Sequence, residues 1–589
     1  MFQGGVIILK KYTADFETAT WYEDRTYVWA WAVCEIGNDY HLEYGNDIES
    51  FLEFCRKSNN STFYFHNLKF DSEFIICYLL ENGFTYASTK EEIKDKTFTT
   101  IISDMGMFYE LKIYFKKSKK KATKVTIYDS LKIIPFSVKE IAKAFNLEES
   151  KLELDYLKKR EEGHILTKEE KDYITNDVLI VAKALNVIFN EKLNKMTQGS
   201  NALHDFKEII GKDKFNHLFP HLPLELDLDL RKGYKGGFTY LNPLYKEKEV
   251  GKGSVLDVNS LYPYVLRSKS MPYGEPVYYE GKYEYDFVYP LYMQMLVCEF
   301  KIKENKIPTI QLKKSKVFMP NEYIRDSGDE PICLVLTSVD LKLFLEQYEI
   351  KYIKYICGWK FKSKDGIFDK YIDKWITRKI EASKEGNKGQ RTLAKLMLNS
   401  LYGKFATSLV VGSKYPIVED GVVHYKMNEE EIKEGLYLPI GAFTTAYARE
   451  ITIRTAQSIT DYSILKYGKD LFYYSDTDSL HSGLSLEELK QFCDIDDNRL
   501  GAWKCEGVFD KAKFIRQKCY IEDFNGEIKI TCAGLPKTCY DYVTWENFKT
   551  GFSCGGKLTY SHVKGGIILK ETEFTIKEEK LKKNIEEFL

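Results

Sequence analysis

Three aspartates that lie far apart in the sequence constrain the fold more than any other feature. The run GSVLDVNSLYPYV places apolar strand residues before Asp257, and roughly 220 residues later DLFYYSDTDSL places Asp476 and Asp478 two positions apart. One Asp-x-Asp alone is compatible with a simple acidic turn, but the aromatic run before it indicates a strand. Neighbouring carboxylates repel each other unless a cation lies between them. We therefore expect a fold in which these three acids converge on divalent metal.

The segment between these acids contains a basic run, KGQRTLAKLMLNSLYGKF, with helical spacing. A helix would place one polar stripe opposite the apolar residues Leu396, Met397 and Leu401. The polar stripe consists of Arg391, Lys395, Asn399 and Tyr402. Gly403 is expected to end this helix. An ordinary amphipathic surface helix is the alternative, but cations that face a carboxylate metal pair are what the binding of a triphosphate requires.

The length and composition indicate a multidomain globular protein. A chain of 589 residues exceeds one hydrophobic core, and the usual domain size suggests about three to five domains. Hydrophobic residues make up 44% of the chain and the mean hydropathy is -0.37, so the chain can bury cores and is not disordered by composition. The apolar runs are too short for a membrane span or a signal peptide. We expect neither membrane insertion nor secretion.

The charge balance and the cysteines limit the possible ligands and the cellular compartment. With 86 Lys and Arg against 87 Asp and Glu, the chain is no polycation, yet a nucleic-acid channel needs only a local positive stripe. The lysine cluster at 116–124 is expected to be a solvated hairpin, with nucleic-acid contact as the weaker alternative. The 12 cysteines include no Cys-x-x-Cys pair, which favours reduced core thiols in the cytosol over a disulfide framework or a zinc site.

The order of the periodic segments indicates how the chain is organised. Residues 1 to about 190 alternate strand-like and helical runs, which predicts an α/β or α+β domain. The helical segment at roughly 371–405 lies more than 100 residues beyond the strand at 254–258, so we expect an insertion between them. The run KYPIVEDGVVHYKM has strand-forming residues on both sides of Asp420-Gly421, which predicts a type I′ hairpin.

The N-terminal segment contains a second set of carboxylates. YTADFET is typical of a strand, on which Asp15 and Glu17 would project from the same face. Such a pair is common on exposed strands, but on a buried face the two acids would need a divalent cation. Two further segments place an acid four residues after another polar residue, which is one face of a helix: HNLKFDSEF, and a helix at about 168–189 that opens with a capping box. They contribute the residues Asn67, Phe70, Asp71, Phe74, Tyr173 and Asp177.

These motifs carry a specific resemblance when they are taken in order. DFE, NxxFD and YxxxD resemble the three exonuclease motifs of proofreading 3′ to 5′ exonucleases, which have a ribonuclease-H-like fold. DVNSLYP, KLMLNSLYG and YSDTDS resemble motifs A, B and C of family B DNA polymerases, and RQKCYI resembles the KxY motif, with Lys518 and Tyr520 on one strand face. KGGFTYLN, the insertion and the hairpin resemble the protein-primed subgroup, closest to its phage members. The similarity covers about residues 12–577, and the last dozen residues are expected to form an extra helical tail.

The resemblance implies a multidomain α+β or α/β fold. A ribonuclease-H-like 3′ to 5′ exonuclease domain would precede a right-hand polymerase of palm, fingers and thumb with two insertions. The implied units are the exonuclease domain (1–197), the first part of the palm (198–268), insertion 1 (269–370), the fingers (371–406), insertion 2 (407–441), the second part of the palm (442–545) and the thumb with the tail (546–589). Insertion 1 would contact a priming protein. Insertion 2 would close a ring around DNA and give processivity and strand displacement.

The resemblance also assigns roles in the polymerase site. Asp257, Asp478 and the carbonyl of Val258 would be metal ligands, Asp476 would support them, and the cofactor would be two Mg²⁺ per active site, with Mn²⁺ as a substitute. Tyr262 would lie under the sugar and exclude a 2′-OH, and Lys379, Arg391 and Lys395 would bind the triphosphate. Asn399 and Tyr402 would lie at the base pair, and Lys518 and Tyr520 would lie at the primer end. Arg391 stands where lysine is usual, which keeps the charge but changes its geometry.

In the exonuclease site, the resemblance implies that Asp15, Glu17, Asp71 and Asp177 hold two metals. Two metals about 3.5 to 4 Å apart can stabilise the attacking and leaving oxygens of a phosphodiester. Tyr173 would orient the attacking water, and Lys151 would assist catalysis. The residues implied to hold the single-stranded 3′ end are His66, Asn67, Phe70, Phe74, Ser130 and Leu131.

The function implied by the resemblance is that of a DNA-directed DNA polymerase with proofreading, which is protein-primed, processive and strand-displacing and replicates a phage-type linear genome. Its partners would be primer-template DNA, dNTPs and a terminal priming protein, and it would act as a monomer in the host cytoplasm. One alternative is the same fold with a nucleic-acid primer in a linear plasmid or organelle. A catalytically degenerate DNA-binding scaffold is another. Reverse transcription fits less well, because motif C is DTD where that class has paired aspartates.

Overall fold

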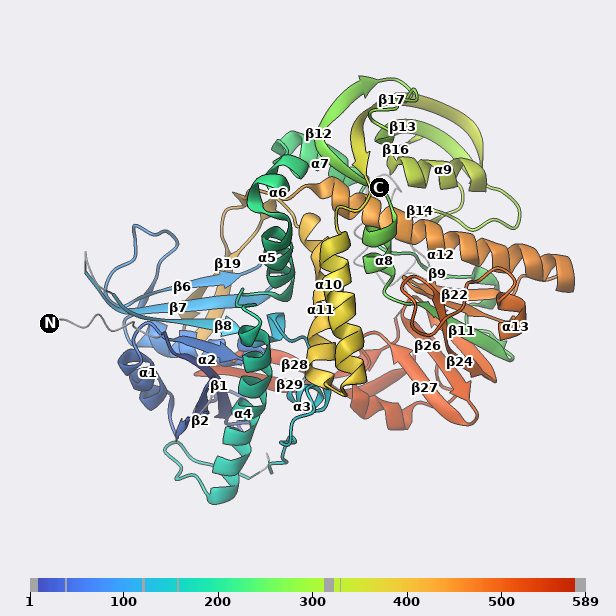
Figure 1. The fold of residues 1–589 in the computed structure, drawn as a ribbon. Helices are drawn as coiled ribbons and strands as arrows, with labels where there is room; N and C mark the ends of the chain where they lie inside the picture. The colour runs from blue at the N-terminus through green and yellow to red at the C-terminus, as the bar shows by residue number, and fades with distance from the viewer. Residues whose placement is uncertain are drawn as a thin grey trace.

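The computed structural model describes residues 9–37, 40–118, 122–155, 158–311, 323–328 and 330–577. An N-terminal β-sheet domain lies at one side of the molecule, a pair of long helices lies at its centre, and two sheets with a long helix form the opposite side (Figure 1). The expected tail lies outside the described residues, as do residues 119–121 of the lysine cluster. The strands on either side of that cluster pair antiparallel, as expected for a hairpin.

A mixed eight-stranded sheet forms the core of the N-terminal domain, in the order β3-β2-β1-β4-β8-β7-β6-β5. Its strands are β1 (Lys11–Thr18), β2 (Val28–Glu35), β3 (Leu42–Gly45), β4 (Thr62–Phe65), β5 (Thr85–Tyr86), β6 (Thr97–Ile102), β7 (Phe108–Lys117) and β8 (Ala122–Asp129). The strands β1, β4 and β8 run parallel at the centre. Such an arrangement needs helical cover, which comes from α1 (Ile48–Lys57), α2 (Leu68–Glu81) and α4 (Lys168–Asn190). The α/β prediction for this part of the chain is confirmed.

Helix α4 shows how local sequence fixes an element that carries site residues. The Thr167 hydroxyl accepts from the backbone N–H of Glu170, and the Glu170 carboxylate accepts from the backbone N–H of Thr167 at 3.0 Å. This capping box satisfies two donors at the helix start, where no intrahelical acceptor exists. The predicted capping box and the helix that follows it are confirmed.

Two antiparallel sheets form the C-terminal side of the molecule. The first has the order β24-β11-β23-β22-β9, and the second has the order β10-β25-β26-β27. The strands of the first are β9 (Thr239–Leu241), β11 (Gly253–Val258), β22 (Phe472–Asp476), β23 (Ser479–Ser482) and β24 (Trp503–Phe509). Those of the second are β10 (Glu249–Val250), β25 (Lys511–Arg516), β26 (Cys519–Phe524) and β27 (Glu527–Cys532). Helix α12 (Leu438–Tyr467) packs on the first sheet, and α8 (Leu261–Ser268) packs against α12 in the same hydrophobic core.

The predicted basic helix is α11 (Lys388–Phe405), which packs beside α10 (Asp369–Lys384) at the centre of the molecule (Figure 1). Its apolar stripe faces inward as predicted, with Met397 and Leu401 buried. The expectation that Gly403 ends the helix is wrong, because the helix runs on to Phe405. Phe405 is buried against Phe219, with ring centroids 5.1 Å apart. This packing keeps the last turn helical, and a glycine ends a helix only where the backbone turns left-handed.

The segment predicted as insertion 1 contains a sheet with the order β12-β17-β13-β16, covered by α9. These elements are β12 (Met271–Glu280), β13 (Leu291–Ile302), β16 (Ile332–Thr337), α9 (Ser338–Gln347) and β17 (Tyr348–Lys364). The type I′ hairpin is confirmed between β19 (Lys414–Glu419) and β20 (Val422–Met427), with φ 52° at Asp420 and 75° at Gly421. Helix α12 begins at Leu438, so the expected boundary between 441 and 442 falls inside a helix.

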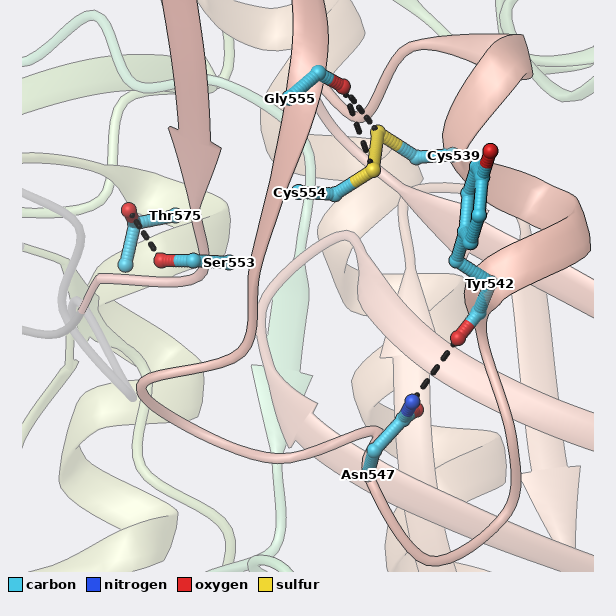
Figure 2. The surroundings of a disulfide bond; sticks show 7 residues. All are labelled: Cys539, Tyr542, Asn547, Ser553, Cys554, Gly555 and Thr575. Atoms are coloured by element: carbon cyan, nitrogen blue, oxygen red, sulfur yellow. Dashed lines mark hydrogen bonds between the residues drawn. A yellow bond between two sulfur atoms is a disulfide. The ribbon is translucent and has the colours of Figure 1, made fainter.

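In the described part of the segment expected to be the thumb, a long hairpin of β28 (Ser553–Val563) and β29 (Gly566–Thr575) reaches back to the N-terminal domain (Figure 1). At its base, one cysteine pair contradicts the expectation of reduced thiols. Cys539, in η3 (Lys537–Tyr542), is bonded to Cys554, with the Cα atoms 6.0 Å apart (Figure 2). The pairing depends on how β28 folds back over η3, which no local spacing reveals. Seven of the other ten cysteines are buried thiols, as expected.

Candidate active sites

The aspartates at 257, 476 and 478 converge at the sheet β24-β11-β23-β22-β9, and these three acids with their surroundings are called the palm site below, after the domain expected there. Strand β11 pairs antiparallel with β23, which places Asp257 opposite Ser479. The backbone N–H of Val258 donates to the carbonyl of Asp478 at 2.8 Å. Asp476 ends β22 and Asp478 follows it in a tight turn, where the intervening Thr477 has a φ of 63°. The predicted juxtaposition of these acids is confirmed.

The electrostatics of these acids show that they are crowded. Burial and then the negative charges of Asp478 and Glu506 raise the pKa of Asp257 to about 7, whereas Lys504 and Lys395 oppose the shift. Burial also raises the pKa of Asp478. Half-buried carboxylates that repel each other are stabilised by a cation, and their oxygen atoms are the ligands that Mg²⁺ prefers.

Asp476 differs from the other two acids because it already has protein partners. The Lys518 ammonium donates to both of its carboxylate oxygens at 2.9 Å, and the Thr239 hydroxyl donates to one of them at 3.1 Å. Lys518 was expected on the face of a strand with Tyr520, but it lies in the turn before β26 with a φ of 53°. This turn lets the lysine reach Asp476, whereas Tyr520 lies within the strand and packs on Tyr474.

The predicted basic stripe faces the acids. The charge of Lys395 on α11 acts on both Asp257 and Asp478. Burial lowers the pKa of Lys379 on α10, and the nearby charges of Arg391 and Lys395 lower it further. Three cations from two helices therefore gather beside the carboxylates, which is the charge distribution that an anionic ligand would neutralise.

Two tyrosines lie next to the acids, as the motifs suggested. The rings of Tyr262 on α8 and Tyr402 on α11 stack with centroids 4.1 Å apart. Gly237 lies so close that a Cβ there would be 2.8 Å from the Thr477 side chain and 3.0 Å from the Tyr262 hydroxyl. Asn399 is exposed one turn before Tyr402. Tyr262 and Tyr402 form one wall beside Asp478, and there is no room for a side chain at Gly237.

The second set of carboxylates also converges. Asp15 and Glu17 on β1, Asp71 on α2 and Asp177 on α4 interact electrostatically and lie in buried surroundings. Burial and then the charge of Asp177 raise the pKa of Asp15 to about 7. Burial and neighbouring carboxylates raise the pKa of Glu17 and of Asp71 far above the usual range. The Lys151 ammonium lies 3.2 Å from a carboxylate oxygen of Asp177 and opposes this crowding.

A cavity of about 950 Å³ opens onto these acids. Asp15, Glu17 and Asp177 line one side of it together with Lys151 and Tyr173. The opposite wall belongs to the thumb hairpin and consists of Leu558, Ile568, Leu569, Lys570 and Glu571. Sequence reasoning missed this wall, because β28 and β29 carry no motif and reach the cavity only through the fold.

The residues expected to hold a single-stranded 3′ end are not equally accessible from this cavity. Phe70 lines the cavity, and its ring centroid is 5.5 Å from that of Phe74, which is buried beneath the thumb turn at Gly566. The backbone N–H of Asn67 donates to Asp129 at 3.0 Å.

The loop behind these aromatic residues is held by internal hydrogen bonds. His66 Nδ1 lies 2.9 Å from the Ser130 hydroxyl, and its Nε2 lies 2.6 Å from the carbonyl of Phe136. Ser130 is fully buried, and Leu131 follows it in a short 3₁₀ turn. In this structure His66 and Ser130 therefore bind each other and the backbone.

A divalent metal fits the donor atoms present. One carboxylate oxygen of Asp71 and one of Asp177 are buried without a hydrogen-bond partner, and a buried charged oxygen is costly unless something pairs with it. Over the described part of the chain, no three His, Cys, Asp or Glu side chains are already close enough together to enclose a metal ion. The fold therefore brings these acids into electrostatic contact with one another.

Sequence reasoning also missed two residues of the palm site. Lys504 and Glu506 on β24 act on Asp257 because β24 pairs with β11 across about 250 residues of sequence. Their alternating positions on an ordinary strand give no signal of a site.

In the ranges that the structure describes, no helix is long and apolar enough to cross a membrane.

Comparison with known proteins agrees with this geometry. Residues 52–165 and 156–488 match the family described as DNA polymerase type B, organellar and viral. The DNA polymerase of Bacillus phage M2 is 44% identical over 96% of this chain and 100% of its own length. The DNA polymerase of Bacillus phage phi29 is 43% identical over 96% of this chain and 99% of its own length. That of Streptococcus phage Cp-1 is 31% identical over 96% of this chain and 98% of its own.

Solved structures extend the similarity to the whole fold. Phi29 DNA polymerase complexed with primer-template DNA and incoming nucleotide substrates is 42% identical, with a TM-score of 0.89 over 97% of this chain and 100% of that one. Its complex with primer-template DNA alone gives a TM-score of 0.90 at 41% identity and the same coverage. Both values describe one multidomain polymerase fold. The chain therefore belongs to the type B DNA polymerases and is closely related to phi29 DNA polymerase.

Proposed function

We propose that this DNA polymerase is protein-primed, processive and strand-displacing, and that it proofreads with a 3′ to 5′ exonuclease. It would replicate a phage-type linear genome as a monomer in the host cytoplasm. The observation that carries the proposal is that Asp257 and Asp478 lie close together and face the cations of α10 and α11, while a second carboxylate cluster lies in the N-terminal domain. The relationship to phi29 DNA polymerase supports each part.

In the palm site, Asp257, Asp478 and the Val258 carbonyl would hold two Mg²⁺, with Mn²⁺ as a substitute. Bound metal supplies charge that stabilises the attacking and leaving oxygens in a phosphoryl transfer. The cations on α10 and α11 would bind the triphosphate, and Tyr262 would lie under the sugar. Lys518, held on Asp476, would bind the primer end, so that the 3′-OH can attack the α-phosphate in line.

In the exonuclease site, Asp15, Glu17, Asp71 and Asp177 would hold the metals. Tyr173, which lines the cavity with these acids, would orient a water for attack on the terminal phosphodiester. Phe70 and Asn67 would hold the unpaired 3′ end by stacking and hydrogen bonding. The thumb residues across the cavity would keep that strand between α2 and the hairpin.

Separate substitutions test the two sites. Asp478→Ala should abolish primer extension and leave degradation of a single-stranded 3′ end intact, because the two clusters share no residue. Asp15→Ala should do the reverse. Retained extension by Asp478→Ala would overturn the assignment of the palm site, and retained degradation by Asp15→Ala would overturn that of the exonuclease site.

Protein priming has its own support and its own test. The connection between β12 and β13 in insertion 1 exposes apolar side chains, with Tyr285 80% and Phe287 84% exposed. We expect this surface to bind a priming protein, whose hydroxyl side chain would accept the first nucleotide. Phe287→Ser should reduce nucleotide transfer to the priming protein and leave extension of a DNA primer unchanged. A variant that loses both activities equally, or that keeps both, would contradict this role.

A further inference from the structure

One buried carboxylate joins three parts of the chain that are distant in sequence. Glu73 on α2 is 1% exposed. One of its oxygens accepts a hydrogen bond from the hydroxyl of Tyr425 at 2.8 Å, and the other lies 3.2 Å from Nε2 of His562. Tyr425 belongs to β20, in the hairpin of insertion 2, and His562 belongs to β28 in the thumb. Glu73 thus stands where the exonuclease domain, insertion 2 and the thumb meet.

The chemistry of this contact favours a strong attachment. A carboxylate taken out of water is costly unless charged or hydrogen-bonding groups pair with it. Burial and then the charge of Glu73 raise the pKa of Tyr425 far above its usual range, so its hydroxyl keeps the proton that it donates. The rings of Tyr425 and His562 lie 5.9 Å apart and form a contact of their own.

The surrounding contacts bring the ends of both hairpins to the same place. The backbone N–H of Gly565, in the thumb turn, donates to the carbonyl of Gly421, in the insertion turn, at 3.4 Å. That carbonyl also faces the Cys77 thiol on α2 at 3.6 Å. Val423 of the insertion and Ile567 of the thumb are both buried in the core that includes α2. These contacts are noncovalent, so the junction can open without unfolding either hairpin.

We propose that Glu73 is a latch that holds the insertion 2 hairpin and the thumb together, and that processive synthesis by this chain depends on it. The inference rests on the proposed function, in which these two elements close a ring around DNA. An enzyme that forms a closed ring around a circular template leaves that template only when the ring opens. The contacts made by Glu73 would therefore set how often the polymerase dissociates, without touching substrate.

The test uses the partners of Glu73, because Glu73 itself follows Asp71 by two positions and a change there would also disturb the exonuclease site. Tyr425→Phe removes one hydrogen bond and keeps the ring, and His562→Ala removes the second contact. His424→Ala is the matched control, because His424 is exposed and neighbours Tyr425 on the same strand. All three side chains lie outside the palm site.

The assay is extension of a primed single-stranded circle by the full chain with Mg²⁺ and dNTPs, in the presence of excess unlabelled primer-template as a trap. Each trapped product then reports one binding event. A hydrogen bond to a charged group is strong enough that Tyr425→Phe should shorten products by about tenfold. His562→Ala should also shorten them, and His424→Ala should match the wild type. The rate of adding a single nucleotide should not change in any variant.

The outcomes separate the latch from the proposed function. A processive wild type with equally processive Tyr425→Phe and His562→Ala variants would overturn the latch alone. A wild type that adds only a few nucleotides per binding event would overturn the proposed processivity and the latch with it. Hydrogen exchange on the DNA-free protein gives an independent reading. Tyr425→Phe should speed exchange in both β20 and β28, and unchanged exchange in these strands would also overturn the latch.

Discussion

The crowding at Asp257 predicts that the palm site destabilises the metal-free protein. Burial and the nearby carboxylates raise the pKa of this residue from 3.8 to about 7. A tenfold change in an acid dissociation constant corresponds to about 1.4 kcal/mol, so the ionised carboxylate costs the fold at most about 4 kcal/mol. Because the side chain is only half-buried, solvent screening reduces this to about 2 kcal/mol. Asp257→Asn removes the charge and keeps the shape, and it should recover this free energy.

The sign of the effect follows from proton binding. A carboxyl whose pKa is raised by folding binds its proton more tightly in the native state, so this contribution to stability is present below about pH 4 and is lost as the pH rises through 7. The difference between Asp257→Asn and the wild type should therefore be about 2 kcal/mol at pH 8. It should shrink as the pH falls and approach zero only below about pH 4.

The measurement is calorimetric unfolding with EDTA, with hydrogen exchange of β11, β22 and β23 to identify the palm transition, because a multidomain chain need not unfold in two states. Adding Mg²⁺ should stabilise the wild type and have little effect on the variant. Asp497→Asn, an exposed change in the same part of the chain, is the control. An Asp257→Asn protein that is less stable than the wild type in EDTA at pH 8 would refute the reasoning.

Three further substitutions test particular contacts. Gly237→Ala should reduce the rate of primer extension by about tenfold or more, because its Cβ would lie 2.8 Å from Thr477 and misplace the wall of the palm site. Gly236→Ala is the control, because nothing lies within 4 Å of its Cβ, and it should extend primers at the normal rate. Arg449→Met should lower palm stability in denaturant unfolding by about 3 to 5 kcal/mol, because it leaves the aspartate partner of a buried ion pair uncompensated. Cys539→Ser should lower thumb stability by about 3 kcal/mol under oxidising conditions, because a closed loop of 15 residues is released. With reductant, this variant should match the wild type in thermal unfolding.

The sequence predicted those parts of the structure that local patterns determine. Asp15 and Asp257 each belong to a strand whose apolar residues are recognisable, and the capping box at Thr167 marks the start of α4. The I′ turn follows from the dipeptide Asp420-Gly421, because both positions need a positive φ. These features depend on a few neighbouring residues, so a single sequence suffices to find them.

The missed parts depend on contacts between distant segments. Glu506 reaches Asp257 only through the pairing of β24 with β11, and Leu558 reaches the cavity beside Asp15 only because the hairpin β28-β29 crosses to the N-terminal domain. The disulfide is of the same kind. Helix α11 extends past Gly403 because Phe405 packs into the core, which no propensity could reveal. Tertiary packing decided each of these features.

The two carboxylate clusters differ in how much positive charge the protein supplies to them, and this difference has a measurable consequence. Lys395, Lys504 and Lys518 act on the palm acids. In the N-terminal cluster, the opposing cations that act on Glu17 are Lys151 and Arg160, and they leave its pKa far above the usual range. Metal that binds both clusters, as proposed above, would have to displace protons from the N-terminal acids at a pH where more of the palm acids are already ionised.

The concentration of Mg²⁺ needed for half-maximal activity should therefore depend more steeply on pH for the exonuclease than for the polymerase. Each proton displaced adds about a tenfold change per pH unit. Titrating both activities with Mg²⁺ at pH 6.5 and pH 8 measures the two slopes on one preparation. Because Lys151→Met removes a cation from the exonuclease cluster alone, it should steepen only the exonuclease slope. Equal slopes in the wild type would mean that the crowding of these acids is relieved by something other than metal.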